Sequence, residues 1–295
     1  MGWMEQAARE PVEKISEKIR GEWTYYDKAA ITKTAGIKMA VIGREKVGKS
    51  IFSASASLVE KWTDSVVGPK IPPGVVTSII DTENAASWLP RFYKKQFKAK
   101  KVRVCPVYVE NDEKEVDPCK SFELFWDTLV ELADEKEGTI VIDSLSDVYS
   151  WVNSYLRLEV LKLGPKKTGF QADVRPSDWY WRNDKWESLM KLIRRVHCNV
   201  IVTAKVKEVW DVLPTDTGKQ RLQKTGAYAP VWHYSTGYWL DLILEMNIKY
   251  VGGVATRYGT VRGSRAGLNF NEEIVKPSFG KILDRIAVIE PTLDF

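Results

Sequence analysis

The chain has 295 residues, of which 44% are hydrophobic and 28% are charged, and these proportions are those of a globular protein and exclude a disordered one. The formal net charge of +5 is a mild basic excess, which permits a nucleic-acid partner without requiring one. The three cysteines have no metal-ligand spacing, and their odd number does not suggest a disulfide framework. The two histidines exclude a histidine-rich metal site. No apolar run reaches the roughly 18 residues of a membrane span, and the first residues form no signal-peptide core, so a cytoplasmic protein with no membrane partner is expected.

A helical arm is expected at the start of the chain, over residues 1–35. Val12, Ile15 and Ile19 have helical spacing, with Glu and Lys residues between them. Such an arm could pack on its own domain or dock on a neighbouring subunit, and the sequence leaves both possibilities open. Residues 36–295 are expected to form one larger domain.

Segments of strand and helix type alternate through much of this larger domain. The expected strands cover residues 37–42, 75–81, 102–109, 139–142 and 200–204, and the expected helices cover residues 49–62, 85–97, 122–133 and 179–196. After residue 236 the pattern changes to strands joined by short turns, at 242–251, 255–262 and 282–289. This order predicts an α/β fold with a mostly parallel central sheet, helices on both faces and antiparallel strands added at the C-terminal end.

A phosphate-binding loop follows the first expected strand. Gly43-Arg-Glu-Lys-Val-Gly48-Lys49-Ser50 matches the pattern G-x-x-x-x-G-K-[ST] without a departure. Glycines let the backbone wrap around phosphates so that amide groups point inward, and the following helix contributes its positive N-terminus. Lys49 is expected to reach the β- and γ-phosphates of ATP, and Ser50 is expected to hold Mg²⁺. The predicted nucleotide-binding residues are Gly43, Arg44, Glu45, Lys46, Val47, Gly48, Lys49, Ser50 and Ile51.

Carboxylates end two other apolar strands downstream of this loop. Asp143 closes the second of them, and an acid in this place is the usual partner of Mg²⁺ in P-loop proteins. We therefore predict a magnesium site formed by Ser50 and Asp143. Asp81 and Glu83 follow the earlier strand, and ATP hydrolysis requires such a group to orient the attacking water.

A Walker A loop, a D-x-E element after the next strand and a later apolar strand ending in Asp143-Ser144 together resemble the RecA superfamily. The resemblance covers about residues 37–265. It implies a RecA-like P-loop core, and it implies that Glu83 is the catalytic carboxylate that orients water. The segments Asp143-Ser-Leu-Ser-Asp-Val, Asp178-Trp179 and Val202-Thr-Ala-Lys205 are similar to those of short RecA-like ATPases of phages and archaeal mobile elements. A prokaryotic or virus-infected host cell is the implied setting.

The chain departs from RecA at the end of the last parallel strand. RecA has Asn-Gln there, whereas this chain has Thr203-Ala204-Lys205. We expect Lys205 to act as a catalytic cationic sensor or as a finger across a subunit interface, although a solvated lysine would give the same sequence. Other candidates for a charge-neutralising finger are the late arginines Arg257, Arg262 and Arg265.

Two stretches lie where RecA-like proteins contact DNA, namely residues 149–182 and 207–238. Aromatic side chains interleaved with cations suit stacking on bases and pairing with phosphates. Buried aromatics and solvated lysines are the competing interpretation. The residues concerned are Trp151, Tyr155, Arg157, Lys162, Lys166, Lys167, Phe170, Arg175, Trp179 and Tyr180 in the first stretch, and Trp210, Lys219, Arg221, Lys224 and Tyr228 in the second, much of which is polar and expected to be mobile.

The leading hypothesis is a Mg²⁺-dependent ATPase that acts on single- or double-stranded DNA as a homo-oligomeric ring or filament, in recombination or replication of a virus or mobile element. One alternative is a ring-forming motor that packages or unwinds DNA, although Ser144 replaces the Glu that many such motors carry after the Walker B acid. A second alternative is a KaiC-like regulatory nucleotide switch, or a small-molecule kinase, with protein or metabolite partners. No arginine-rich lid is visible in the sequence to favour a kinase.

Overall fold

The computed structural model of the chain describes residues 36–61, 76–135, 138–163, 174–214 and 220–288. Every described residue belongs to one compact unit, Lys33–Phe295. The arm expected over residues 1–35 lies outside the described residues, as does most of the linker that precedes β2. No helix in the described ranges is long and apolar enough to cross a membrane.

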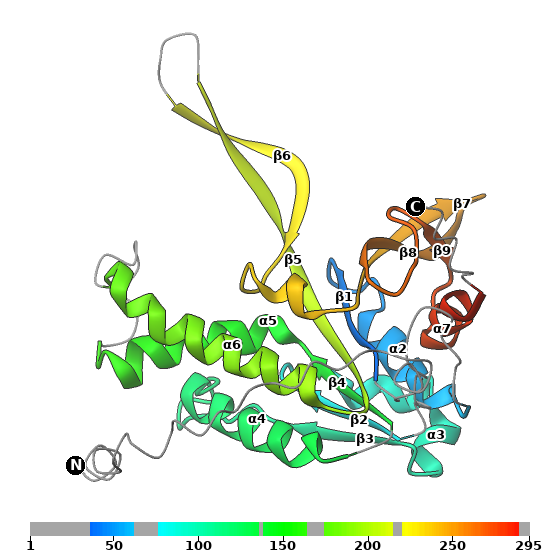
Figure 1. Ribbon diagram of the computed structural model, residues 1–295, viewed down its shortest axis with the longest axis horizontal. Coiled ribbons are helices and arrows are strands. Elements are labelled where there is room, and N and C mark those ends of the chain that lie inside the picture. Colours follow the sequence, from blue (N-terminus) through cyan, green and yellow to red (C-terminus); the bar gives the residue numbers. More distant parts are fainter. Residues whose placement is uncertain (1–35, 62–75, 136–137, 164–173, 215–219, 289–295) are drawn as a thin grey trace, which may run out of the picture. The chain divides into compact units, whose positions relative to one another are not determined.

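A mixed sheet organises the unit (Figure 1). Its strand order is β3-β2-β4-β5-β1-β7-β8-β9, and β6 pairs with the distal part of β5. The strands from β3 to β7 in this order run parallel, and β8 and β9 are antiparallel additions. The predicted fold class is therefore confirmed. The strands are β1 Lys38–Gly43, β2 Thr77–Asp81, β3 Val102–Pro106, β4 Thr139–Asp143, β5 Asn199–Pro214, β6 Gln220–Pro230, β7 Leu242–Val251, β8 Val254–Ser264 and β9 Glu273–Val275.

Each face of the sheet carries its own hydrophobic core, because successive side chains of a strand point to opposite faces. Met39 and Val41 of β1 join the core on one face, whereas Ala40 and Ile42 join the core on the other. The first core includes α2 Lys49–Ala54 and α7 Phe279–Val288, and the second includes α4 Pro118–Ala133, α5 Leu145–Tyr155 and α6 Trp179–Arg195. Helices therefore cover both faces.

Two expected helices are shorter or divided in the structure. The helix after the P-loop ends at Ala54 and continues as a 3-10 turn to Leu58, because the Ser55 and Ser57 hydroxyls donate to backbone carbonyls three residues earlier. The expected helix at 85–97 divides at Pro90 into a 3-10 segment, Ala86–Arg91, and α3, Lys94–Lys98.

The strand expected over 282–289 is wrong, since this segment belongs to helix α7. The buried residues of α7 are Phe279, Ile282, Leu283 and Ile286, which have the i, i+3, i+4, i+7 spacing of one helix face. Phe279, which completes this buried face, lies before residues 282–289, the apolar segment that suggested a strand. Its neighbour β9, only three residues long, was not expected from the sequence.

The two expected DNA-contacting stretches are more regular than the sequence suggested. The first begins inside α5, which a π-helical turn extends over Leu156–Val160, and it includes Trp151, which is buried. The second forms a long β5–β6 hairpin that extends beyond the sheet (Figure 1). The part of that stretch expected to be a mobile loop is thus largely strand from Gln220 onwards. Lys166, Lys167, Phe170, Lys219 and the side chain of Arg221 lie outside what the structure describes.

Candidate nucleotide-binding site

The P-loop connects β1 to α2 at the carboxyl edge of the parallel strands. Its two motif glycines have backbone conformations that suit glycine, with φ of +153° at Gly43 and +100° at Gly48. A Cβ on Gly43 would lie 2.6 Å from the carbonyl oxygen of Met246, and a Cβ on Gly48 would lie 2.7 Å from Nε of Arg257. Gly43 therefore needs glycine for space as well as for backbone geometry, whereas at Gly48 the backbone geometry is the main requirement because the neighbouring atoms belong to a side chain.

The side chain of Lys49, at the end of the P-loop, reaches back to the residues that begin the loop. Its Nζ donates hydrogen bonds to the carbonyl oxygens of Gly43 at 3.0 Å and Arg44 at 2.9 Å. Burial lowers the pKa of Lys49, and the nearby carboxylates of Asp143 and Glu83 oppose that shift. A partly desolvated cation beside a glycine loop is the arrangement that a polyphosphate requires.

Asp143 ends β4 and is buried against two hydroxyl groups. The Thr203 hydroxyl donates to Asp143 Oδ1, and Ser50 also hydrogen-bonds to this carboxyl group. Burial raises the pKa of Asp143, while these two hydrogen bonds oppose the shift. Thr203 thus contacts the Walker B acid from the position where the chain departs from RecA.

The donor set at this point fits magnesium. A serine hydroxyl and a carboxylate are hard oxygen ligands, and Mg²⁺ at such sites takes its other ligands from phosphates and water. Accordingly, the predicted pair of Ser50 and Asp143 lies together in the structure. No group of three His, Cys, Asp or Glu side chains in the described ranges could hold a metal ion by itself.

The two carboxylates of the D-x-E element have different surroundings. Asp81 is buried, and its carboxylate accepts hydrogen bonds from the backbone N–H groups of Glu83 and Ala85, both at 3.1 Å, and of Ala86 at 2.9 Å. It therefore fixes the turn after β2. Glu83 instead lines the cavity beside the P-loop.

Lys205 of β5 joins Glu83 to a carboxylate that the sequence analysis did not assign. Lys205 Nζ lies 3.2 Å from Glu83 Oε1 and 2.9 Å from Asp147 Oδ1. Burial raises the pKa of Glu83 and the Asp147 carboxyl raises it further, whereas Lys205 lowers it. Burial alone would lower the pKa of Lys205, but the two carboxylates hold it above its ordinary value.

Asp147 is itself held by hydroxyl groups. Its Oδ2 accepts from the Ser144 hydroxyl at 2.7 Å and from the Thr82 hydroxyl at 3.1 Å. The sequence contained a signal for this residue, because Asp147 belongs to the segment that suggested the RecA subgroup. Its role could not be predicted, since only the fold brings the start of α5 against β5.

These residues surround one cavity of about 390 Å³. The P-loop forms one wall, and Glu83, Asp143 and Lys205 approach from β2, β4 and β5. Trp88 adds an aromatic side chain, and Arg257 adds a cation from β8. All three predicted catalytic residues and both predicted metal ligands therefore lie together, with Arg257 of the same chain beside them.

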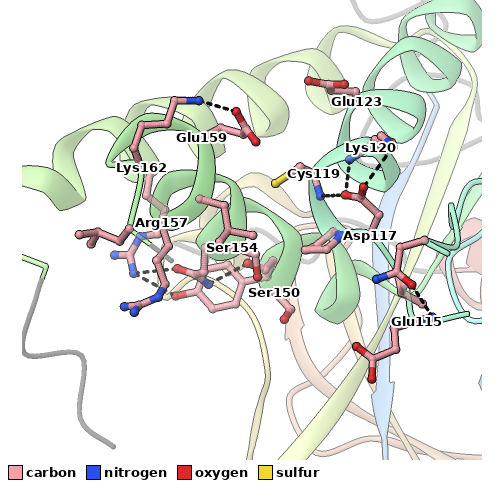
Figure 2. Close-up of a pocket in the computed structure, with 18 of the residues that line it drawn as sticks. Glu115, Asp117, Cys119, Lys120, Glu123, Ser150, Ser154, Arg157, Glu159 and Lys162 are labelled. Atoms are coloured by element: carbon pink, nitrogen blue, oxygen red, sulfur yellow. Dashed lines mark hydrogen bonds and ion pairs between the residues drawn. The ribbon is translucent and has the colours of Figure 1, made fainter. Parts of the chain in front are cut away.

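A larger groove of about 1290 Å³ lies elsewhere, between the start of α4, the end of α5 and the start of α6 (Figure 2). It contains Arg157, Lys162, Trp179 and other residues of the first expected DNA-contacting stretch. However, its lining carries four carboxylates beside four cations: Glu115, Asp117, Glu123, Glu159, Lys120, Arg157, Lys162 and Arg182. Lys162 pairs with Glu159 and Lys120 with Asp117, so the groove has no excess of positive charge.

The β5–β6 hairpin contacts the P-loop directly. The Arg44 guanidinium lies 4.1 Å from the centroid of the Tyr228 ring and also donates a hydrogen bond to the Tyr228 hydroxyl. Farther along the hairpin, the Trp210 side chain is exposed, and Lys224 Nζ lies 5.1 Å from the centroid of its ring. The hairpin therefore reaches the cavity beside the P-loop through Lys205 on one strand, and contacts Arg44 of the P-loop itself through Tyr228 on the other.

Comparison with solved structures gave distant matches. A KaiC-like protein from the hyperthermophilic archaeon Pyrococcus horikoshii OT3 has 13% identity and a TM-score of 0.44, over 82% of this chain and 85% of that one. The RadB recombinase has 12% identity and a TM-score of 0.43, over 82% and 87%. The flagellar accessory protein FlaH from Methanocaldococcus jannaschii has 12% identity and a TM-score of 0.36, over 84% and 88%. No curated protein matched the sequence.

A family model gives a stronger result than these structures. Residues 35–268, most of the chain, match the model of the AAA domain family AAA_24. The matched range contains the P-loop, both strand-end carboxylates and the whole β5–β6 hairpin. Because the matched range covers most of the chain, this match shows that the chain belongs to the AAA domain family AAA_24.

Proposed function

We propose that the protein binds ATP and Mg²⁺ at the P-loop and hydrolyses the γ-phosphate. The observation that carries this proposal is the convergence of Lys49, Ser50, Glu83, Asp143 and Lys205 on one cavity. Lys49 contacts the β- and γ-phosphates, and Ser50 with Asp143 holds the magnesium ion. The ion, when bound, neutralises charge on the phosphate oxygens.

Glu83 orients the attacking water in this proposal. Water oxygen bonds to the γ-phosphorus as the bond to the β–γ bridging oxygen breaks, and Glu83 accepts the water's proton. The raised pKa of Glu83 suits that role, because a base whose pKa approaches the working pH accepts and releases protons readily. Lys205 lies beside Glu83, where it can stabilise negative charge on the transferring phosphoryl group.

We further propose that the ATPase acts on DNA through the β5–β6 hairpin, as an oligomer serving recombination or replication of a phage or mobile element. Strand β5 extends from Lys205 in the cavity to the exposed Trp210, with an irregularity in its pairing between Glu208 and Trp210, so one strand joins the nucleotide to the outer hairpin. Exposed aromatics and Lys207 are suited to single-stranded nucleic acid. The groove of Figure 2 is less suited to a polyanion because of its carboxylates.

That groove favours a second candidate, a nucleotide switch with a protein partner. Mixed charges in a polar groove are typical of protein–protein contact surfaces, where opposite charges determine which partner is accepted. The KaiC-like regulatory switch, one of the alternatives from the sequence, is a protein of this kind. It predicts slow ATP turnover that does not change when DNA is added.

Steady-state ATP hydrolysis with and without single- and double-stranded DNA distinguishes the two. Lys49→Ala should lose nucleotide binding, and Glu83→Gln should keep binding while turnover falls about 100-fold or more. Stimulation by DNA that both variants abolish would support the DNA-directed ATPase. Turnover that depends on Lys49 and Glu83 but ignores DNA would favour the switch.

A further inference from the structure

Three late arginines were candidates for a cation that acts on the phosphates, and the structure separates them. Arg262 Nε lies 2.6 Å from Glu245 Oε2, and a second nitrogen of Arg262 donates to Asn271. Arg265 donates to the carbonyl oxygen of Tyr238 at 2.5 Å. Both guanidinium groups are therefore engaged by other groups, and neither arginine lines the cavity that contains Lys49 and Ser50.

Arg257 has a different position. It lines the cavity that contains Lys49 and Ser50, and its Nε would be only 2.7 Å from a Cβ at Gly48. Within the described residues its side chain forms no ion pair, in contrast to Arg262. Its backbone is fixed, because strand β8 pairs Arg257 with Ile248 and the N–H of Lys276 donates to the Arg257 carbonyl oxygen at 2.8 Å.

A second cavity of about 260 Å³ meets the first at Gly48, Ile51 and Arg257. Its lining adds the side chain of Lys276, and it contains no Asp or Glu among the residues that the structure describes. Two cations without a carboxylate, next to a glycine of the P-loop, form an environment for an anion. The glycine at position 48 leaves the space through which Arg257 approaches the loop.

We propose that Arg257 binds the phosphate chain of the nucleotide held by its own P-loop, so that this cation acts within one chain rather than across a subunit interface. The proposal rests on the proposed ATP site. It differs from the expectation of a finger donated by a neighbouring subunit, because the P-loop that Arg257 contacts is its own.

Nucleotide binding tests the assignment without relying on turnover. Titration with fluorescent ATP and ADP analogues should show Arg257→Ala binding both about tenfold or more weakly, since a charge-assisted hydrogen bond is lost. Arg257→Lys should restore part of the affinity, and Arg262→Ala, the matched control from the same strand, should bind as the natural chain does. Unchanged affinity in Arg257→Ala, with thermal unfolding showing both proteins folded, would overturn the proposal.

Mixing two variants that each lack one of the two residues separates action within a chain from action between chains. A mixture of Lys49→Ala and Arg257→Ala holds no chain with both residues, so ATPase activity should stay at the sum of the two variants. Activity that rises on mixing would mean that an intact Arg257 serves a neighbouring P-loop, and the proposal would be wrong. A natural chain that binds no nucleotide would instead overturn the proposed ATP site itself.

Discussion

Lys205 Nζ lies between two carboxylates, 3.2 Å from Glu83 and 2.9 Å from Asp147. One cation thereby connects the proposed catalytic base to a residue at the start of α5. Its position also joins β5, and hence the hairpin, to the cavity beside the P-loop. Changes to Lys205 and Asp147 should therefore alter the protonation of Glu83 in opposite directions.

Lys205→Ala should lower kcat at least about tenfold while nucleotide binding is retained, because a cation beside the reacting phosphoryl group is lost. Lys205 also lowers the pKa of Glu83, so its removal should raise that pKa further. The acid limb of the pH–rate profile should consequently move to higher pH. Lys207→Ala, two residues along the same strand and outside the cavity, is the control: without DNA it should keep the natural kcat and pH profile.

Asp147→Asn should move the acid limb the other way. The Asp147 carboxyl raises the pKa of Glu83, so replacing it with a neutral amide of similar size should lower that pKa. Turnover should then persist to lower pH than in the natural chain. Measurement of kcat from pH 5 to 8 checks this, and a shift in the same direction as Lys205→Ala would contradict the arrangement.

The contact between Arg44 and Tyr228 should matter more for coupling than for basal hydrolysis, because neither residue lines the cavity that contains Lys49 and Ser50. A cation–π contact at an exposed site contributes about 0.5–1 kcal/mol, so Arg44→Ala and Tyr228→Ala should each reduce stimulation by DNA a few-fold. The double variant should show no greater loss than either single variant. Effects that simply add in this double-mutant cycle would show that the two side chains act independently.

Lys38 should make folding stability depend on alkaline pH. It is buried at the start of β1, where its Nζ donates to the carbonyl oxygens of Val196 and Cys198, both at 2.7 Å, and to that of Gly36 at 3.1 Å. Burial lowers the pKa of Lys38 to about 8 from 10.5. Between these values the unfolded chain binds more protons at this lysine than the folded chain, so stability from this group rises as the pH rises.

Urea unfolding of the natural chain and of Lys38→Met at pH 7.5 and 9.5 tests this sign. The natural chain should gain about 2 kcal/mol relative to the variant over that interval, because each unit of pKa difference corresponds to about 1.4 kcal/mol. A stability difference between the two proteins that is constant with pH would show that Lys38 keeps its proton in both states. If the natural chain instead loses stability relative to Lys38→Met between pH 7.5 and 9.5, the predicted direction of the pH dependence is wrong.

The sequence by itself determined the features that depend on local pattern. The P-loop spacing, the alternation of strands and helices and the strand-end positions of Glu83 and Asp143 are all readable along the chain, because phosphate binding and burial impose residue types at fixed intervals. Thus the α/β fold could be predicted, together with five residues of the cavity: Lys49, Ser50, Glu83, Asp143 and Lys205. The late strand at 242–251 was predicted for the same reason.

Only the tertiary structure decided which polar groups meet. Asp147 and Arg257 come from α5 and β8, and their distance from the P-loop depends on strand order, which no local pattern encodes. Likewise, the polar residues of β6 form a strand against β5, because the backbone hydrogen bonds between the two strands compensate for the weak strand propensity of β6. Long-range packing also made a helix of 279–288, since Phe279 and Ile286 bury the same face against the sheet.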